Sequence, residues 1–162
     1  LEDFGIKSAK IYLGGNTQLK GLKSDGSKWR VGITDPYDSS SLLGIITVEN
    51  KAVITSGGYE RFFTDEESGI TYHHIMDPQT CKSAESGLES VSIISEDGTM
   101  ADALSTAMFV LGETRALNYW RQYGGFEMIL ITKSNQVICT KGLIDVYSAS
   151  DTAVSYKVRY AE

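Results

Sequence analysis

The residues best suited to chemistry are a carboxylate and a hydroxyl four positions apart. Asp102 and Thr106 lie in a segment with helical periodicity, so they share one face, with Ser105 close by. Mg²⁺ takes oxygen ligands and often binds only one or two carboxylates together with phosphate, so the pair predicts a magnesium site. The spacing equally allows a plainer interpretation, in which Thr99 is the N-cap and Asp102 completes a capping box.

Two adjacent histidines form the second candidate. His73 and His74 precede Ile75, and an Asp77-Pro78 pair follows. Histidine titrates near neutral pH, which suits it to accept a proton or to contact a phosphate. The alternative is structural: the two histidines end a strand and face opposite sides, and Asp77-Pro78 makes a turn.

Two glycine-containing segments are weaker candidates. Gly14-Gly15-Asn16 follows a predicted strand, and Thr55-Ser56 precedes Gly57-Gly58. Glycines let a backbone approach phosphate closely, but neither segment has the spacing of a nucleophile elbow or a phosphate-binding loop. A two-residue hairpin turn explains Gly57-Gly58 without any chemistry.

The spacing of apolar residues, which predicts the elements that position these residues, changes along the chain from strand-like to helical. Alternating or β-branched runs predict strands at 10–13, 29–33, 42–48, 52–56, 59–63, 89–95, 126–132 and 136–140, and a last strand in which Val154, Tyr156, Val158 and Tyr160 alternate. An apolar stripe predicts a helix, with Gly112 as its stop and a second helix over 113–123; its members are Met100, Ala103, Leu104, Ala107, Met108 and Leu111. Many antiparallel strands with two grouped helices indicate an α+β fold.

Composition narrows the function classes. The 162 residues suit one soluble globular domain, and a net charge of -6 argues against nucleic acid as a partner. No apolar run is long enough to span a membrane, and no signal-peptide pattern opens the chain. Cys81 and Cys139 have no metal-ligand spacing; one disulfide or two free thiols are both possible.

The order of the motifs is more specific than any one of them. From about residue 9 to residue 147 the chain resembles the C-terminal half of the ApbE flavin transferases, formerly called thiamine-biosynthesis lipoproteins. The segments that carry the resemblance are Gly14-Gly15-Asn16, WRVGITDP at 29–36, TSGGY at 55–59, HIMDPQT at 74–80, ADALSTA at 101–107 and FVLG at 109–112.

The resemblance implies a fold and an activity. The family fold is α+β and related to the tunnelling fold. Its members take FAD, transfer the FMN half to a Thr or Ser of a target flavoprotein, and release AMP. By resemblance, Asp102 and Thr106 are the Mg²⁺ ligands and His74 is a flavin-site residue and the candidate base. Ser56, Gly57 and Ile75 are expected to lie along the FAD.

The chain differs from the family pattern in two ways, and other functions remain as alternatives. Family members carry a further segment before Gly14, with flavin-stacking residues and a backbone metal ligand, so residues 1–162 are expected to be a single C-terminal domain or fragment, soluble and inactive alone. The longer protein is expected to be exported and lipid-anchored to a membrane. An FAD-binding module, an FAD pyrophosphatase or a purely structural domain are the alternatives. Cys81 stands where the family usually has Gly, at a turn that disfavours a Cβ.

Overall fold

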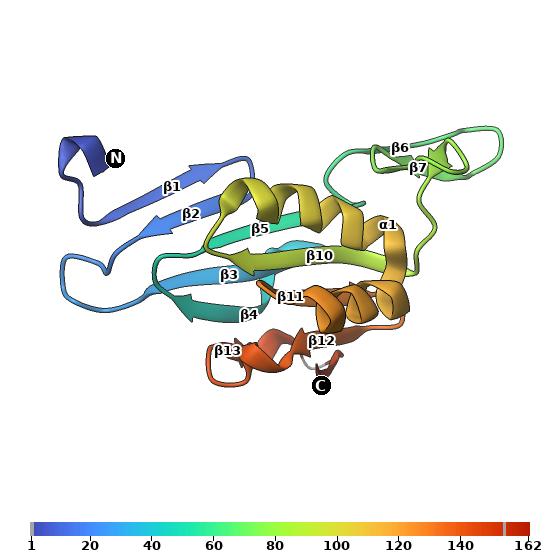
Figure 1. The fold of residues 1–162 in the computed structure, drawn as a ribbon. Helices are drawn as coiled ribbons and strands as arrows, with labels where there is room; N and C mark the ends of the chain where they lie inside the picture. Colours follow the sequence, from blue (N-terminus) through green and yellow to red (C-terminus); the bar gives the residue numbers. More distant parts are fainter. Residues whose placement is uncertain (1, 154) are drawn as a thin grey trace.

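A seven-stranded sheet forms the centre of the molecule (Figure 1). The computed structural model describes residues 2–153 and 155–162. Across the sheet the strands are β1 (Ala9–Leu13), β2 (Asn16–Lys20), β5 (Ala52–Gly57), β10 (Leu88–Ser95), β11 (Glu127–Thr132), β12 (Gln136–Thr140) and β14 (Lys157–Ala161). Neighbouring strands are antiparallel up to β12, which pairs with β14 in parallel. The predicted antiparallel α+β fold is confirmed; Val154, in the predicted last strand, lies outside the described residues.

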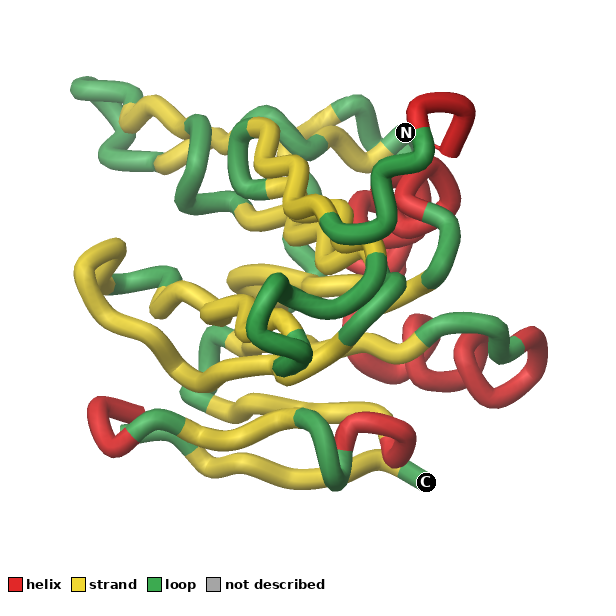
Figure 2. The backbone as a smooth tube through the Cα atoms, turned by 90° about the vertical axis from the view of Figure 1, so that its left-hand side faces the viewer, coloured by secondary structure: helices red, strands yellow, loops and turns green. Residues whose placement is uncertain are grey.

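The sheet is covered on both faces. The helix α1 (Gly98–Tyr123) packs on one face, and Figure 2 shows its turns on one side of the strands. The other face packs against a three-stranded sheet of β3 (Trp29–Asp35), β4 (Asp38–Val48) and β13 (Tyr147–Ala149). Short 3-10 helices occupy Glu2–Phe4, Lys141–Leu143 and Asp151–Ala153.

The alternation of side chains along β11 separates two cores. Met128 and Leu130 belong to the core beneath α1, whereas Ile129 and Ile131 belong to the core between the two sheets. Successive side chains of a strand point to opposite faces, so a strand covered on both sides is apolar at every position. β11 is therefore a doubly buried strand, and α1 packs mainly across β10 and β5 on one side of it.

A two-stranded arm projects from this body. It consists of β6 (Phe62–Thr64) and β7 (Thr71–His73), followed by the short pair β8 (Met76–Asp77) and β9 (Lys82–Ser83). In Figure 1 the arm stands apart from the main sheet, beyond the end of β5 and the start of β10. The histidine motif lies between β7 and β8, at the base of this arm.

The hairpin predicted at Gly57-Gly58 is wrong. β5 pairs with β2 and β10, and β6 pairs with β7 instead. Neither glycine has the positive φ that a tight hairpin turn demands. They are needed for close packing: a Cβ on Gly57 would lie 2.4 Å from the Tyr59 ring, and one on Gly58 would lie 3.0 Å from the His73 ring.

The helix begins two residues earlier than predicted. Asp97 is the N-cap, and its Oδ1 accepts hydrogen bonds from the backbone N–H groups of Thr99 and Met100 at 2.8 and 3.0 Å. This satisfies donors that the first turn leaves without helical partners. The predicted cap at Thr99 is therefore wrong, and Asp102, one turn further on, does not serve a capping box.

Gly112 interrupts the helix instead of ending it. Its φ of 75° and ψ of 170° are not helical, yet one hydrogen-bonded element continues to Tyr123. The two predicted helices are thus two halves of α1. The predicted apolar stripe is also misplaced, because Met100, Ala103 and Ala107 are exposed. The helix buries a different set: Ala101, Ser105, Met108, Phe109, Gly112, Ala116, Leu117 and Trp120.

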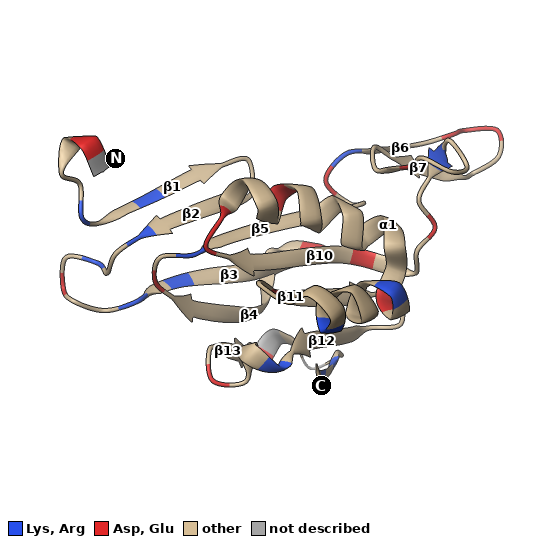
Figure 3. Cartoon of the chain, in the orientation of Figure 1, with Lys and Arg blue, Asp and Glu red and all other residues tan. Residues whose placement is uncertain are grey.

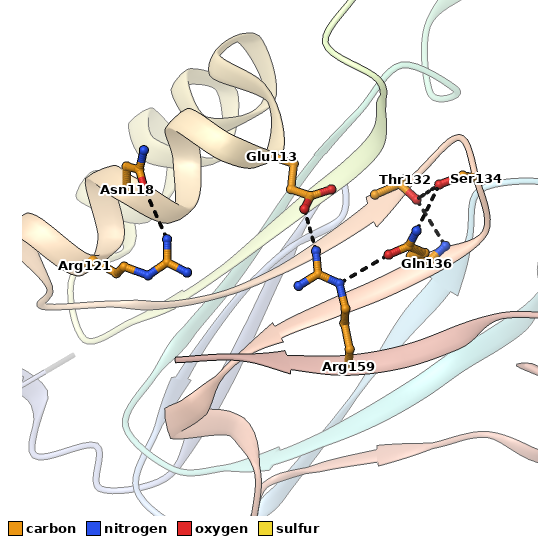
Figure 4. Close-up of polar contacts among 7 residues, drawn as sticks. All are labelled: Glu113, Asn118, Arg121, Thr132, Ser134, Gln136 and Arg159. Carbon is orange, nitrogen blue, oxygen red and sulfur yellow. Dashed lines mark hydrogen bonds and ion pairs between the residues drawn. The ribbon is translucent and has the colours of Figure 1, made fainter.

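The second half of α1 is tied to the far edge of the sheet. Arg159 of β14 pairs with Glu113 and donates from Nε to Gln136 Oε1 at 3.2 Å, as Figure 4 shows. Arg121 donates to Asn118 Oδ1 within the helix. The same view includes the turn hydrogen bonds among Thr132, Ser134 and Gln136. The charged side chains of this region thus have partners within the protein.

Candidate functional site

Asp102 projects from the first half of α1 toward the edge of the sheet. The β1–β2 hairpin, which turns at Gly14-Gly15 with positive φ at both glycines, brings Asn16 to the start of the helix. Asn16 Nδ2 donates a hydrogen bond to Asp102 Oδ1 at 3.1 Å. Asp102 is the only charged residue from Gly98 to Leu111, and Figure 3 shows the first half of α1 as largely uncharged.

Thr106 lies one turn further along the same face and belongs to a group of three hydroxyls. Ser56 Oγ on β5 lies 2.8 Å from Ser105 Oγ and 3.1 Å from Thr106 Oγ1. Ser105 Oγ donates to the Asp102 carbonyl oxygen at 2.9 Å. Ser105 is fully buried, whereas Thr106 and Asp102 are exposed. The group explains why a serine is found on the buried face of the helix: its hydroxyl has partners on β5 and in the preceding turn.

The donor set fits a hard divalent cation in type. A carboxylate and a hydroxyl oxygen suit Mg²⁺, which is usually held by few protein groups together with phosphate and water. Among the described residues no three His, Cys, Asp or Glu side chains gather into a metal cluster. Asp102 and Thr106 would therefore supply part of a coordination shell, and the remaining oxygens would have to come from a ligand, water or another segment.

His74 is held by the backbone of the arm. Its N–H and its Nδ1 both lie within hydrogen-bond distance of the Arg61 carbonyl oxygen, at 3.1 and 3.3 Å. A carbonyl only accepts, so Nδ1 carries the proton of this bond, and in the neutral imidazole Nε2 then has the free lone pair. The imidazole is exposed, so that Nε2 is free to accept a proton from a ligand.

His73 is a structural residue. Its Nε2 lies 3.1 Å from the Ala84 carbonyl oxygen, and its ring meets the Phe109 ring edge-on with centroids 5.5 Å apart. Its Nδ1 is buried and has no hydrogen-bond partner. The two histidines thus differ as their positions on opposite sides of a strand end predict: one packs on α1 and one is exposed.

Glu60 adds a carboxylate to the surroundings of His74. Partial burial raises the pKa of Glu60, while the nearby His74 and Arg61 act against this shift. Its Oε1 also lies 3.4 Å from the position that a Cβ on Gly15 would take. The segment that leads from β5 into the arm therefore approaches the Gly14-Gly15 turn.

The remaining predicted site residues have less accessible side chains. Ser56 is engaged with the helix hydroxyls, and Gly57 lies beneath the Tyr59 ring. Ile75 packs in the core with 3% of its surface exposed, and its carbonyl accepts from the Ala84 N–H. Contact of Ser56, Gly57 and Ile75 with FAD stays a prediction, and for Ile75 the side chain could not make it without moving out of the core.

Cavities connect the histidine turn with the helix. One of about 540 Å³ is lined by Thr106 and Ala107 on α1 and by Met76 and Pro78 of the turn. Met76 also lines a cavity of about 550 Å³ that includes His74. Asp102 and Asn16 border a further cavity of about 400 Å³. Thr106 and His74 thus open onto hollows that share Met76, whereas the cavity beside Asp102 shares no lining residue with either.

Cys81 occupies the turn that favours glycine. Its φ is 54°, and its N–H donates to the Asp77 carbonyl oxygen at 2.8 Å, so the turn forms in spite of the Cβ. Both cysteines are free thiols: Cys81 is exposed, while burial raises the pKa of Cys139 to about 12. Of the two possibilities that the sequence left open, the structure has the free thiols.

Sequence reasoning missed two contributors to the site. They are Asn16, which orients Asp102, and the Arg61 carbonyl, which holds His74. A polar side chain immediately after a glycine turn was the available signal for Asn16. For Arg61 no signal existed, since the contact is made by the backbone across the arm.

Fold and site together define an α+β domain with an exposed carboxylate and hydroxyl on the first half of one helix and an exposed histidine on a neighbouring turn. The chain belongs to the ApbE family, whose model matches residues 1–130.

Relatives and solved structures agree with this membership. A protein of Treponema pallidum (strain Nichols) named FAD:protein FMN transferase is 38% identical over 149 residues, which are 86% of this chain and 41% of that protein. One of Klebsiella pneumoniae (strain 342) with the same name is 34% identical, covering 82% of this chain and 40% of that protein. The chain therefore spans about 40% of the length of these curated relatives.

Solved structures of the family superimpose on most of the chain. The ApbE protein of Thermotoga maritima has a TM-score of 0.70 at 33% identity, covering 90% of this chain and 43% of that one. The flavinyl transferase ApbE of Pseudomonas stutzeri, in its apo form, has a TM-score of 0.72 at 30% identity, covering 92% of this chain and 46% of that one.

Proposed function

We propose that the protein to which this chain belongs is a Mg²⁺-dependent FAD:protein FMN transferase. Its matched relatives carry that name. The observation that carries the proposal is the exposed pair Asp102 and Thr106. Asp97 performs the capping role that would otherwise have explained Asp102, so the carboxylate is available to a ligand.

The chemistry is a phosphoryl transfer between two oxygens. The hydroxyl oxygen of a Ser or Thr on the target attacks the phosphorus of the FMN half of FAD, and the bond from that phosphorus to the bridging oxygen breaks, so that AMP leaves. The hydroxyl proton passes to His74 Nε2, whose lone pair is kept available by the Nδ1–H bond to the Arg61 carbonyl. A bound Mg²⁺ supplies charge stabilisation at the pyrophosphate.

The other residues of this chain act by positioning. Asp102 and Thr106 would hold the ion from one face of α1. The packing of His73 on Phe109 and the close approach of Gly58 to His73 fix the base of the arm, and with it the place of His74. Phosphoryl transfer depends mainly on such placement, because the protein itself forms no covalent bond.

The test of this function is covalent flavinylation. The complete protein, FAD, Mg²⁺ and a target flavoprotein should yield fluorescent FMN on the target in a denaturing gel, AMP in equal amount, and no labelling in EDTA. Free FMN and AMP without a labelled target would instead identify an FAD pyrophosphatase. Bound FAD without any product would identify a binding module.

The isolated 162-residue chain provides the matched comparison. Its α1 face offers only two side-chain ligands, and the relatives are more than twice its length. Mg²⁺ requires near-octahedral coordination, so a partial ligand set should bind it poorly. We expect no labelling by the isolated chain; robust labelling would show that the rest of the protein is dispensable for transfer.

We also propose that the complete protein is exported and lipid-anchored, on the strength of the family resemblance alone. Within the part of the chain that the structure describes, no helix has both the length and the apolarity to cross a membrane. The distribution of the protein between membrane and soluble fractions after cell lysis tests the anchor.

A further inference from the structure

Three hydroxyls and one carbonyl form a chain of hydrogen bonds from β5 to the exposed face of α1. The chain runs from Thr106 Oγ1 to Ser56 Oγ at 3.1 Å, from Ser56 Oγ to Ser105 Oγ at 2.8 Å, and from Ser105 Oγ to the Asp102 carbonyl oxygen at 2.9 Å. Ser105 is fully buried, so its hydroxyl has no water to turn to.

Counting hydrogens fixes the direction of this chain. A hydroxyl has one hydrogen to donate and two lone pairs to accept with. The carbonyl at the end only accepts, so the hydrogen of Ser105 is committed to it. Ser56 must then donate to Ser105, and Thr106 must donate to Ser56. The hydrogen of Thr106 therefore points inward, toward the sheet.

The direction decides what Thr106 offers to a ligand. With its hydrogen used, Thr106 Oγ1 presents only lone pairs on the exposed side. Asp102 likewise offers only acceptors, and its Oδ1 is held from β2 by the Asn16 amide. An acceptor-only pair attracts a cation, whereas a hydroxyl free to rotate could equally donate to a phosphate oxygen.

We propose that Ser56 and Asn16 are positioning residues for the divalent cation: Ser56 orients the Thr106 hydroxyl, and Asn16 orients the Asp102 carboxylate. This proposal rests on the metal role in the proposed function. It gives Ser56 a different task from direct contact with FAD, because Ser56 acts through Thr106. Each ligand on the helix is thus held from a separate strand, β5 or β2.

The neighbouring residue on β5 supplies a matched control. Thr55 Oγ1 lies 2.7 Å from Ser92 Oγ. This hydroxyl pair joins the adjacent strands β5 and β10, whereas the hydroxyl of Ser56 bonds to α1. Thr55→Val removes that hydrogen bond, as Ser56→Ala removes those of Ser56. The two variants should lose comparable stability, so only the orientation of Thr106 separates them.

The test is the affinity of the complete protein for Mn²⁺. Binding is measured as the decrease of the free Mn²⁺ signal in electron paramagnetic resonance. We expect Ser56→Ala to raise the Kd about tenfold, a loss equivalent to about 1.4 kcal/mol. Ser56→Thr, which keeps the hydroxyl, and Thr55→Val should stay within about twofold. Asn16→Ala, which leaves the core untouched, should raise the Kd about tenfold.

The outcomes separate this proposal from the proposed function. If Asp102→Asn abolishes Mn²⁺ binding while Ser56→Ala binds like the wild type, the site is correct and the role of Ser56 is overturned. An unchanged Kd for Asn16→Ala overturns the role of Asn16 in the same way. If Asp102→Asn itself leaves the Kd unchanged, the metal role fails, and the positioning roles fail with it.

Discussion

The two halves of α1 on either side of Gly112 use polar residues in opposite ways. In the second half, Glu113 pairs with Arg159 of β14. Arg121 donates to the Glu162 carbonyl oxygen and to Asn118 within the helix. In the first half, Asn16 hydrogen-bonds Asp102 and Ser56 hydrogen-bonds Thr106. Both helix residues still expose acceptor oxygens to solvent. Polar groups that are already paired stabilise a fold, whereas groups held in place with spare acceptors are available to a ligand.

The sharpest way to test this division is to delete a large side chain from the second half. Trp120 is 6% exposed, and its Nε1 donates to the Phe126 carbonyl oxygen at 2.9 Å. Trp120→Ala should lower the free energy of unfolding by about 3–5 kcal/mol, measured by urea denaturation. The exposed Met100→Ala in the first half is the control and should cost less than about 1 kcal/mol. Equal losses would contradict the difference in burial between Trp120 and Met100.

The histidines extend the comparison to the arm. His74→Ala in the complete protein should slow FMN transfer about 100-fold, equivalent to about 2.7 kcal/mol of barrier, with little change in stability, because its imidazole is exposed. His73→Ala should instead lower the melting temperature, since it removes the contacts with Ala84 and Phe109. Rates are compared per folded molecule. Similar rate losses in both variants would remove the basis for naming His74 the base.

Gly112 is the boundary between the two halves, and filling it should be costly. An alanine there would have to adopt a φ of 75°, and its Cβ would lie 2.9 Å from the Ser86 carbonyl oxygen. We expect Gly112→Ala to lower the free energy of unfolding by about 2 kcal/mol. Gly125→Ala is the control: its φ is 80° but nothing lies within 4 Å, so only the backbone strain remains. If both variants lose the same amount, the close approach to Ser86 is unimportant.

The ion pair of the second half should matter least. Glu113 and Arg159 are each about 40% exposed as side chains, at 38% and 42%. Exposed pairs contribute about 0–1 kcal/mol, so Arg159→Met should change stability by no more than that and should leave transfer unaffected. A double-mutant cycle with Glu113→Gln measures the pair alone. A coupling above about 2 kcal/mol would mean that this edge of the sheet is more desolvated than its exposure indicates.

Sequence periodicity predicted the longer strands and the helix, but not β2, β13, the short strands β7 to β9, or the buried face of the helix. Most strands and the extent of α1 were predicted within a few residues, because alternation and helical spacing reflect burial. The buried face was misjudged, since counting apolar residues cannot foresee that Ser105 is buried against Ser56 and that Met100 remains exposed. Burial of a hydroxyl depends on a partner from a distant strand, which no local pattern records.

Turn and cap chemistry produced the remaining errors. Asp97 and Thr99 are both good N-caps, and only the path of the chain leaving β10 decides between them. Gly57 and Gly58 fit a hairpin turn by sequence, whereas their role is to leave room for the rings of Tyr59 and His73. In the candidate site, the sequence pointed to Asp102, Thr106 and His74, but the residues that hold them became visible only in the tertiary structure.

The most direct measurement compares two aspartates of the same helix in the Mg²⁺ dependence of FMN transfer. Asp97 caps the helix, and Asp102 faces the candidate site. Asp97→Ala should cost about 1 kcal/mol of stability and keep the Mg²⁺ concentration for half-maximal labelling. Asp102→Ala should cost no more stability than that, yet reduce labelling at limiting Mg²⁺ at least 100-fold, about 2.7 kcal/mol. Full labelling by Asp102→Ala at limiting Mg²⁺ would contradict the metal role and leave Asp102 as an ordinary exposed residue.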